Sequence, residues 1–160
     1  MRNPTLRRSI TTLAALSALT ALSAHAVTLK VANQGDALSM DPHSLNETLQ
    51  ISVTSNVYEP LVTRGKDYKL TGGLATSWKQ TAPTVWRFNL RKGVTFHDGK
   101  PFTADDVIFS YERAGGDGSD MKSYVGQIKE IKKIDDHTLD FVTKAPFPIL
   151  PELFTGWMIM

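Results

Sequence analysis

The stretch from Trp86 to Val107 constrains the fold most, because it specifies a strand, two turns and a helix start within one short segment. From Trp86 to Arg91, aromatic and apolar side chains occupy every second position, which is the period of a half-buried strand. Lys92-Gly93 and His97-Asp98-Gly99 are residues that favour turns. They predict a second short strand between them, at residues 94–96.

The helix that follows has a clear beginning and a clear end in the sequence. Thr103 supplies a hydroxyl for the N-cap, and Asp105 and Asp106 place carboxylates in the first turn, where unpaired N–H groups and the helix dipole favour negative charge. Gly115-Gly116 is expected to end the helix. Strand, turns and helix together predict an α/β chain.

The other elements follow from periodicity. Leu49, Val53 and Val57 recur every four residues and predict a helix that starts behind Asn46 and ends before Pro60. Further strands are expected at residues 28–32, 61–64, 128–134 and 138–143, the last two being joined by the turn at 135–137. We expect the strand at 61–64 to share a sheet with the strand that begins at Trp86.

The first 26 residues have the pattern of a secretory signal peptide. Three arginines precede an uncharged apolar run from Ile10 to Leu22, and Ala24-His25-Ala26 fits a cleavage site. The run is shorter than the roughly 20 residues that span a bilayer. The chain has no cysteine, which excludes a lipidated N-terminus and a disulfide scaffold. The sequence therefore predicts a periplasmic protein of Gram-negative type without a stable membrane anchor.

The charge balance argues against two classes of partner. The chain has 18 basic and 16 acidic residues, and cleavage after Ala26 would remove three arginines, leaving 15 basic residues and a net charge of −1. Only Lys129 to Lys133 forms a basic cluster, and it is expected on the solvent side of a structural element. We therefore expect neither nucleic acid nor an anionic membrane as partner.

No enzyme or metal chemistry is visible in the sequence. His97-Asp98 could suggest a general base, but adjacent side chains point in different directions, and Asp98-Gly99 is itself a turn signal. The sequence has no nucleophile motif and no phosphate loop. His43, His97 and His137 stand singly, without the spacing of metal ligands. We expect no catalytic residue, no metal and no cofactor.

Several motifs in order along the chain resemble one known family. These are Asp41-Pro42-His43, Val57 to Leu61 (VYEPL), Leu74 to Trp78 (LATSW), the stretch from Trp86 to Val107, and Ile134 to Leu139 (IDDHTL). Together they resemble the family 5 extracellular solute-binding proteins, the peptide/nickel-type receptors of ABC importers.

The resemblance implies a fold and a division into domains. The fold would be the N-terminal part of a two-lobed periplasmic binding protein of type II, with a small extra domain and mixed sheets. After the signal peptide at residues 1–26, residues 27–60 would begin the first lobe. Residues 61–160 would form the small extra domain, incomplete at its C-terminal end. Members of the family are several times longer, so the chain is expected to be an N-terminal fragment.

The resemblance also implies a function. A monomer would capture oligopeptides or dipeptides by hinge closure and deliver them to the transmembrane subunits of an ABC permease. Two alternatives stay open at this point. One is a receptor of the same fold for nickel, a metal chelate or another small solute, and the other is a sensor protein that presents its ligand to a membrane partner.

Two segments are the candidate ligand contacts. In the resembling family the segment after Asp-Pro-His lies along the ligand, and here it contains Leu45, Asn46, Glu47 and Thr48. An extended backbone can pair with the main chain of a peptide whatever the peptide's sequence. Asn46 is equally suited to cap the following helix, and the two roles are compatible. The resemblance places a second contact at Met121, where relatives often have an aromatic residue, with Tyr124 nearby.

Overall fold

The computed structural model describes residues 28–160. The chain divides into two units between Gln34 and Gly35, and every helix and strand named below belongs to the second unit. The predicted signal peptide lies outside the described residues. The α/β class is confirmed, because residues 48–159 form both helices and strands.

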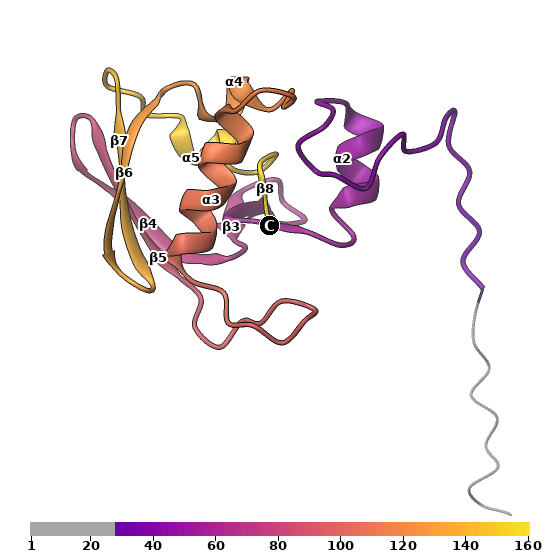
Figure 1. The fold of residues 1–160 in the computed structure, drawn as a ribbon, viewed down its shortest axis with the longest axis horizontal. Coiled ribbons are helices and arrows are strands. Elements are labelled where there is room, and N and C mark those ends of the chain that lie inside the picture. Colours follow the sequence, from indigo (N-terminus) through magenta and orange to yellow (C-terminus); the bar gives the residue numbers. More distant parts are fainter. Residues whose placement is uncertain (1–27) are drawn as a thin grey trace, which may run out of the picture. The chain divides into compact units, whose positions relative to one another are not determined.

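A four-stranded sheet lies at one side of the second unit (Figure 1). It consists of β4 (Ala75–Ala82), β5 (Val85–Leu90), β6 (Ile128–Asp135) and β7 (Thr138–Thr143), in the order β4-β5-β7-β6. All strand pairs within residues 28–160 are antiparallel, whereas we expected mixed sheets. Tight turns join β4 to β5 and β6 to β7, and such turns allow only antiparallel neighbours.

The strand register gathers the large apolar side chains on one face of this sheet. Phe88 of β5 lies opposite Leu139 of β7, and Trp86 lies opposite Phe141. Phe88, Leu139 and Phe141 are fully buried, as the alternation in the sequence indicates. The opposite face carries polar pairs such as Arg87 and Asp140, whose side chains form a bidentate ion pair. The sheet therefore has one dry face and one wet face.

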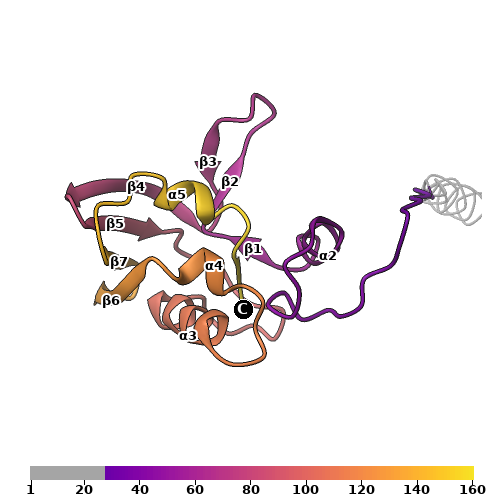
Figure 2. The same ribbon diagram turned by 90° about the horizontal axis from the view of Figure 1, so that it is seen from above.

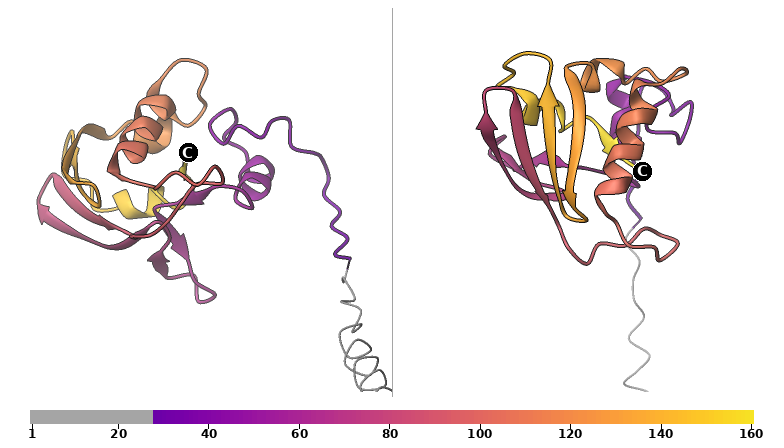
Figure 3. Two further views of the ribbon diagram at one scale, coloured as in Figure 1. Left: turned by 60° about the horizontal axis from the view of Figure 1, so that its bottom comes forward. Right: turned by 60° about the vertical axis from the view of Figure 1, so that its left-hand side comes forward.

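Helices and a short strand cover the dry face. They are α3 (Ala104–Gly115), α4 (Lys122–Val125), α5 (Leu150–Leu153) and β8 (Met158–Ile159). Figures 1 and 3 show α3, α5 and β8 on the same side of the sheet. The predicted start of α3 is confirmed, because the Thr103 hydroxyl accepts from the Asp105 N–H while the Asp106 carboxylate accepts from the Thr103 N–H at 2.7 Å. Its predicted end is also confirmed, since Gly116 is the C-cap.

Two small antiparallel ladders complete the unit. β1 (Glu59–Pro60) pairs with β8, and β2 (Val62–Arg64) pairs with β3 (Leu70–Gly72). Figure 2 shows the β2–β3 hairpin projecting from the rest of the unit. We expected the strand at residues 61–64, which corresponds to β2, to share a sheet with β5, and this expectation was wrong. The chain turns back at once after Arg64, so that the nearest strand in sequence becomes its partner.

Two further predicted strands are not formed. Residues 28–33 have no regular secondary structure, which contradicts the strand expected at 28–32. A strand needs a neighbour for its backbone N–H and C=O groups, and no described strand pairs with this segment. The expected strand at 94–96 is reduced to a single bridge between Thr95 and Pro101, closed by the turn at Gly99 with φ of +86°.

The first described helix is shorter than expected. α2 (Thr48–Thr54) ends before Val57, which is 45% exposed. Its N-cap is Glu47 rather than Asn46, and no side chain accepts a hydrogen bond from its first turn. The prediction that Asn46 caps this helix was therefore wrong. The Asn46 amide instead donates to the Ser123 hydroxyl at 3.4 Å.

Candidate functional site

The chain enters the predicted ligand segment through a turn organised by Asp41. One carboxylate oxygen of Asp41 accepts from the His43 N–H at 2.9 Å. The Asp41 carbonyl accepts from the Ser44 N–H at 3.3 Å and from the Ser44 hydroxyl at 2.9 Å. A carboxylate that bonds the backbone two residues on is an Asx turn, which explains locally why this Asp-Pro-His sequence reverses the chain.

The same carboxylate forms a bidentate ion pair with Arg113 in the last turn of α3. The two N···O distances are 2.9 and 2.5 Å, and each side chain is about one third exposed. The hydrogen bonds from Arg113 hold the pKa of the Asp41 carboxyl below its usual value. Asp41 therefore stays ionised at neutral pH and fixes its turn to α3.

His43 fastens the turn to β8 from within the protein. Its side chain is 1% exposed, and its Nε2 lies 2.9 Å from the carbonyl oxygen of Met158. A carbonyl can only accept, so Nε2 must carry the proton. Nδ1 is then an unprotonated acceptor, and it has no partner within the described residues. Burial lowers the pKa of the His43 imidazole, which disfavours its charged form.

We predict that acid weakens the fold through His43. Above about pH 6.5 the imidazole is neutral in both the folded and the unfolded state. Because the folded-state pKa is lowered, the unfolded state takes up the proton first as the pH falls, and the free energy of unfolding decreases from about pH 6.5 downward. Urea unfolding between pH 7.5 and 5 measures this slope.

One variant makes the test specific to this histidine. His43→Gln keeps an N–H donor for Met158 but does not titrate, so its slope should be shallower than that of the wild type. Equal slopes in the two proteins would contradict the prediction.

Most of the predicted ligand segment lies in a stretch without regular secondary structure directly before α2. Leu45 is half-buried, Asn46, Glu47 and Thr48 are exposed, and Glu47 has extended φ and ψ of −123° and 143°. The backbone N–H and C=O groups of Leu45 and Asn46 form no hydrogen bond with any other residue in the described part of the chain. These backbone groups are therefore available to an extended partner chain.

The structure brings the two predicted contact segments together. The Asp120 N–H donates to the His43 carbonyl at 3.1 Å, and the Asn46 amide reaches Ser123 of α4. Figures 1 and 3 show the loop before α4 beside the segment that leads into α2. Tyr124, in α4, is half-buried, and its ring packs on Gly156.

Met121 lies differently from the other candidates. Its side chain is fully buried in the core that α3 and α4 share with the sheet. In this conformation it presents no side-chain surface to a ligand, so a contact at this position would involve its backbone. The roles of Leu45, Asn46, Glu47, Thr48, Met121 and Tyr124 in binding stay predictions.

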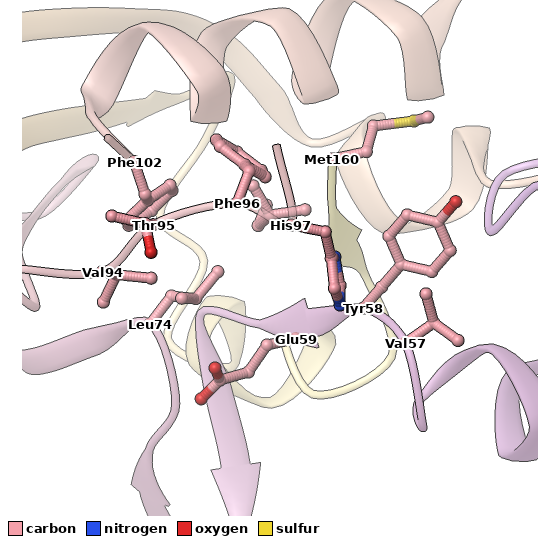
Figure 4. A pocket seen from close by; sticks show the side chains of 11 residues that line it. Val57, Tyr58, Glu59, Leu74, Val94, Thr95, Phe96, His97, Phe102 and Met160 are labelled. Carbon is pink, nitrogen blue, oxygen red and sulfur yellow. The ribbon is translucent and has the colours of Figure 1, made fainter. Parts of the chain in front are cut away.

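An apolar pocket of about 270 Å³ lies apart from these residues. Figure 4 shows its lining, which includes Tyr58, Phe96, His97, Phe102 and Met160. None of the six candidate residues lines it. Its one carboxylate, from Glu59, is paired with Arg91 at 2.6 and 3.1 Å and is not free for a ligand.

Residues 28–160 contain no group of three or more His, Asp or Glu side chains placed to hold a metal ion. In the same residues no helix has both the length and the hydrophobicity needed to cross a lipid bilayer. Arg113 belongs to none of the sequence motifs, and the contact of His43 with Met158 was not predicted from the motif that contains it.

Comparison with known proteins identifies the family. Residues 69–159, more than half of the chain, match the family model for the middle part of bacterial extracellular solute-binding proteins, family 5. The periplasmic oligopeptide-binding protein OppA of Escherichia coli is 29% identical over 76% of this chain, which corresponds to 26% of OppA. The glutathione-binding protein GsiB of Pectobacterium atrosepticum is 32% identical over 68% of this chain and 22% of GsiB.

A solved structure agrees with the sequence matches. Haemophilus influenzae OppA in complex with RPPGFSPFR superimposes with a TM-score of 0.73 at 26% identity, over 78% of this chain and 29% of that one. The chain thus spans about a quarter of the length of the relatives it matches. It belongs to the family 5 bacterial extracellular solute-binding proteins.

Proposed function

We propose that this chain is part of the substrate-binding component of an ABC importer, and that this component captures oligopeptides or dipeptides in the periplasm and delivers them to a membrane permease. Family membership and the names of the relatives, which include oligopeptide-binding and glutathione-binding proteins, support the proposal. The pattern of residues 1–26 supports export by a cleaved signal peptide. Residues 27–60 and 61–160 are proposed as parts of the first lobe and of the small extra domain.

The observation that carries the peptide assignment is the backbone at Leu45 and Asn46, whose N–H and C=O groups have no hydrogen-bond partner among the described residues. A peptide laid along it would form strand-like hydrogen bonds that depend on main-chain groups, which every peptide has. The side chains of Asn46, Glu47 and Thr48 are exposed, so no packed core confines what lies against them. The site therefore suits a class of ligands with a common backbone and varied side chains.

The test is ligand-dependent thermal stabilisation of the full-length protein with a peptide library. A ligand that binds only the folded state stabilises it by RT ln(1 + [L]/Kd), about 2.7 kcal/mol at a ligand concentration of 100 times Kd. Di- and oligopeptides should raise the melting temperature, and the equivalent free amino acids should not. A shift with nickel-histidine complexes and none with any peptide would instead support the metal-chelate receptor.

A further inference from the structure

We propose that Arg113 is a positioning residue for the ligand segment at 45–48, acting through Asp41. The proposal rests on the proposed function, because it concerns the same site. Arg113 does not reach the segment itself. Its guanidinium binds the carboxylate of Asp41, and this carboxylate forms the Asx turn just before the segment.

The position of Arg113 in the chain matters as much as its ion pair. It lies in the last turn of α3, two residues before Gly115, and the loop after the helix leads to Met121 and Tyr124. The bidentate pair therefore links the turn before the first predicted contact segment, residues 45–48, to the helix that precedes the second, at Met121 and Tyr124. The planar guanidinium donates two parallel hydrogen bonds to the carboxylate, which fixes the relative orientation of the two groups as well as their distance. A single hydrogen bond does not fix the orientation in this way.

The ligand segment has few other attachments to this region. Residues 41–47 belong to no strand ladder, so backbone pairing does not hold them in place. The remaining polar links across to the loop and α4 are the Asp120 to His43 bond at 3.1 Å and the long Asn46 to Ser123 bond at 3.4 Å. Of these contacts, only the Arg113 to Asp41 pair is both charged and bidentate.

A second ion pair provides a matched control. Arg87 of β5 binds Asp140 of β7 with distances of 2.7 and 2.8 Å, in the same bidentate geometry. β5 and β7 are already paired along their backbones, and Arg87 lies on the wet face of the sheet. Loss of Arg87 should therefore lower stability without moving any predicted contact residue.

Loss of Arg113 should have a different effect. The turn at Asp41 would lose its ion pair with α3 and keep the contacts of His43 with Met158 and Asp120. The segment at 45–48 would then be held less firmly, and more of its ordering would fall to the ligand at the time of binding. Ordering on binding reduces affinity. We expect Arg113→Met to raise the Kd for peptide about tenfold, consistent with the weight of a charged hydrogen bond.

The experiment measures peptide Kd by calorimetry and the melting temperature for four full-length proteins: wild type, Arg113→Met, Arg113→Lys and Arg87→Met. Arg113→Met and Arg87→Met should both melt lower, but only Arg113→Met should bind about tenfold more weakly. Arg113→Lys keeps the charge without the fork, and it should fold and bind with an intermediate Kd. Asp41→Asn combined with Arg113→Met should bind no worse than Arg113→Met, because both remove the same link.

The outcomes separate this inference from the proposed function. A wild-type protein that binds no peptide would overturn both. Wild-type binding together with equal Kd values for Arg113→Met and Arg87→Met would overturn the positioning role alone. If Arg113→Met does not fold, Arg113→Lys decides, and a wild-type Kd in that folded variant would overturn the role.

Discussion

Replacement of Phe141 by alanine is expected to lower the free energy of unfolding by about 3–5 kcal/mol. Phe141 is fully buried on the dry face of the sheet. Its ring lies 4.7 Å from that of Phe154, 5.1 Å from that of Phe88 and 6.4 Å from that of Trp157, measured between centroids. These partners come from β5 and from the segment after α5, so the cavity would lie where three parts of the chain meet.

Urea unfolding of the variant beside Phe109→Ala measures this effect. Phe109 lies on α3, and its side chain is 54% exposed. The same chemical change there should alter stability by only about 0.5 kcal/mol, because little apolar surface leaves water on folding. A loss below about 1.5 kcal/mol for Phe141→Ala would show that the cluster can collapse around the missing ring, contrary to the close packing of its partners.

The elements that the sequence predicted correctly are those whose signals are local. β5 follows from the alternation that starts at Trp86, and the β6–β7 hairpin follows from two strand patterns around one turn. The start of α3 follows from Thr103 and Asp106, which lie three residues apart and form the capping box. In each case the residues that decide the structure are neighbours in the chain.

The errors arose where partners are distant or equally suitable. β2 had a clear strand pattern at residues 61–64, but nothing in the pattern indicated that β3 would be its partner. Residues 28–32 also had the pattern, and no described strand pairs with them. Asn46 is a residue type that favours the N-cap, but its side chain instead donates a hydrogen bond to Ser123, which lies 77 positions away in the sequence.

The candidate site shows the same division. The segment at 45–48 was predicted as a ligand contact through the Asp-Pro-His motif, which the structure explains as an Asx turn. Arg113 was not predicted to contact this region, because its partner Asp41 lies 72 positions away in the sequence. One arginine on a predicted helix carries no sign of a bidentate contact. The structure was needed to connect the two candidate segments through this pair.

Thr48 offers the most direct test of the ligand segment, because the structure is compatible with proline at this position. Thr48 is the first residue of α2, where proline is common since the N–H has no partner within the helix. The preceding residue, Glu47, already has the extended conformation that proline demands of its neighbour. The Thr48 N–H makes no hydrogen bond with another described residue. Thr48→Pro should therefore fold normally.

Thr48→Pro is nevertheless expected to bind peptide more weakly. If the segment pairs with a peptide backbone, the Thr48 N–H donates to a ligand carbonyl, and proline removes this donor. An unmade hydrogen bond in a closed cleft costs roughly 1–3 kcal/mol, or about 5- to 150-fold in Kd. Calorimetry and circular dichroism of the full-length variant measure binding and folding. Thr48→Ala keeps the N–H and loses only the side chain, so its Kd should stay within about twofold of the wild type. A wild-type Kd in a folded Thr48→Pro variant would mean that the segment serves only as the entry to α2.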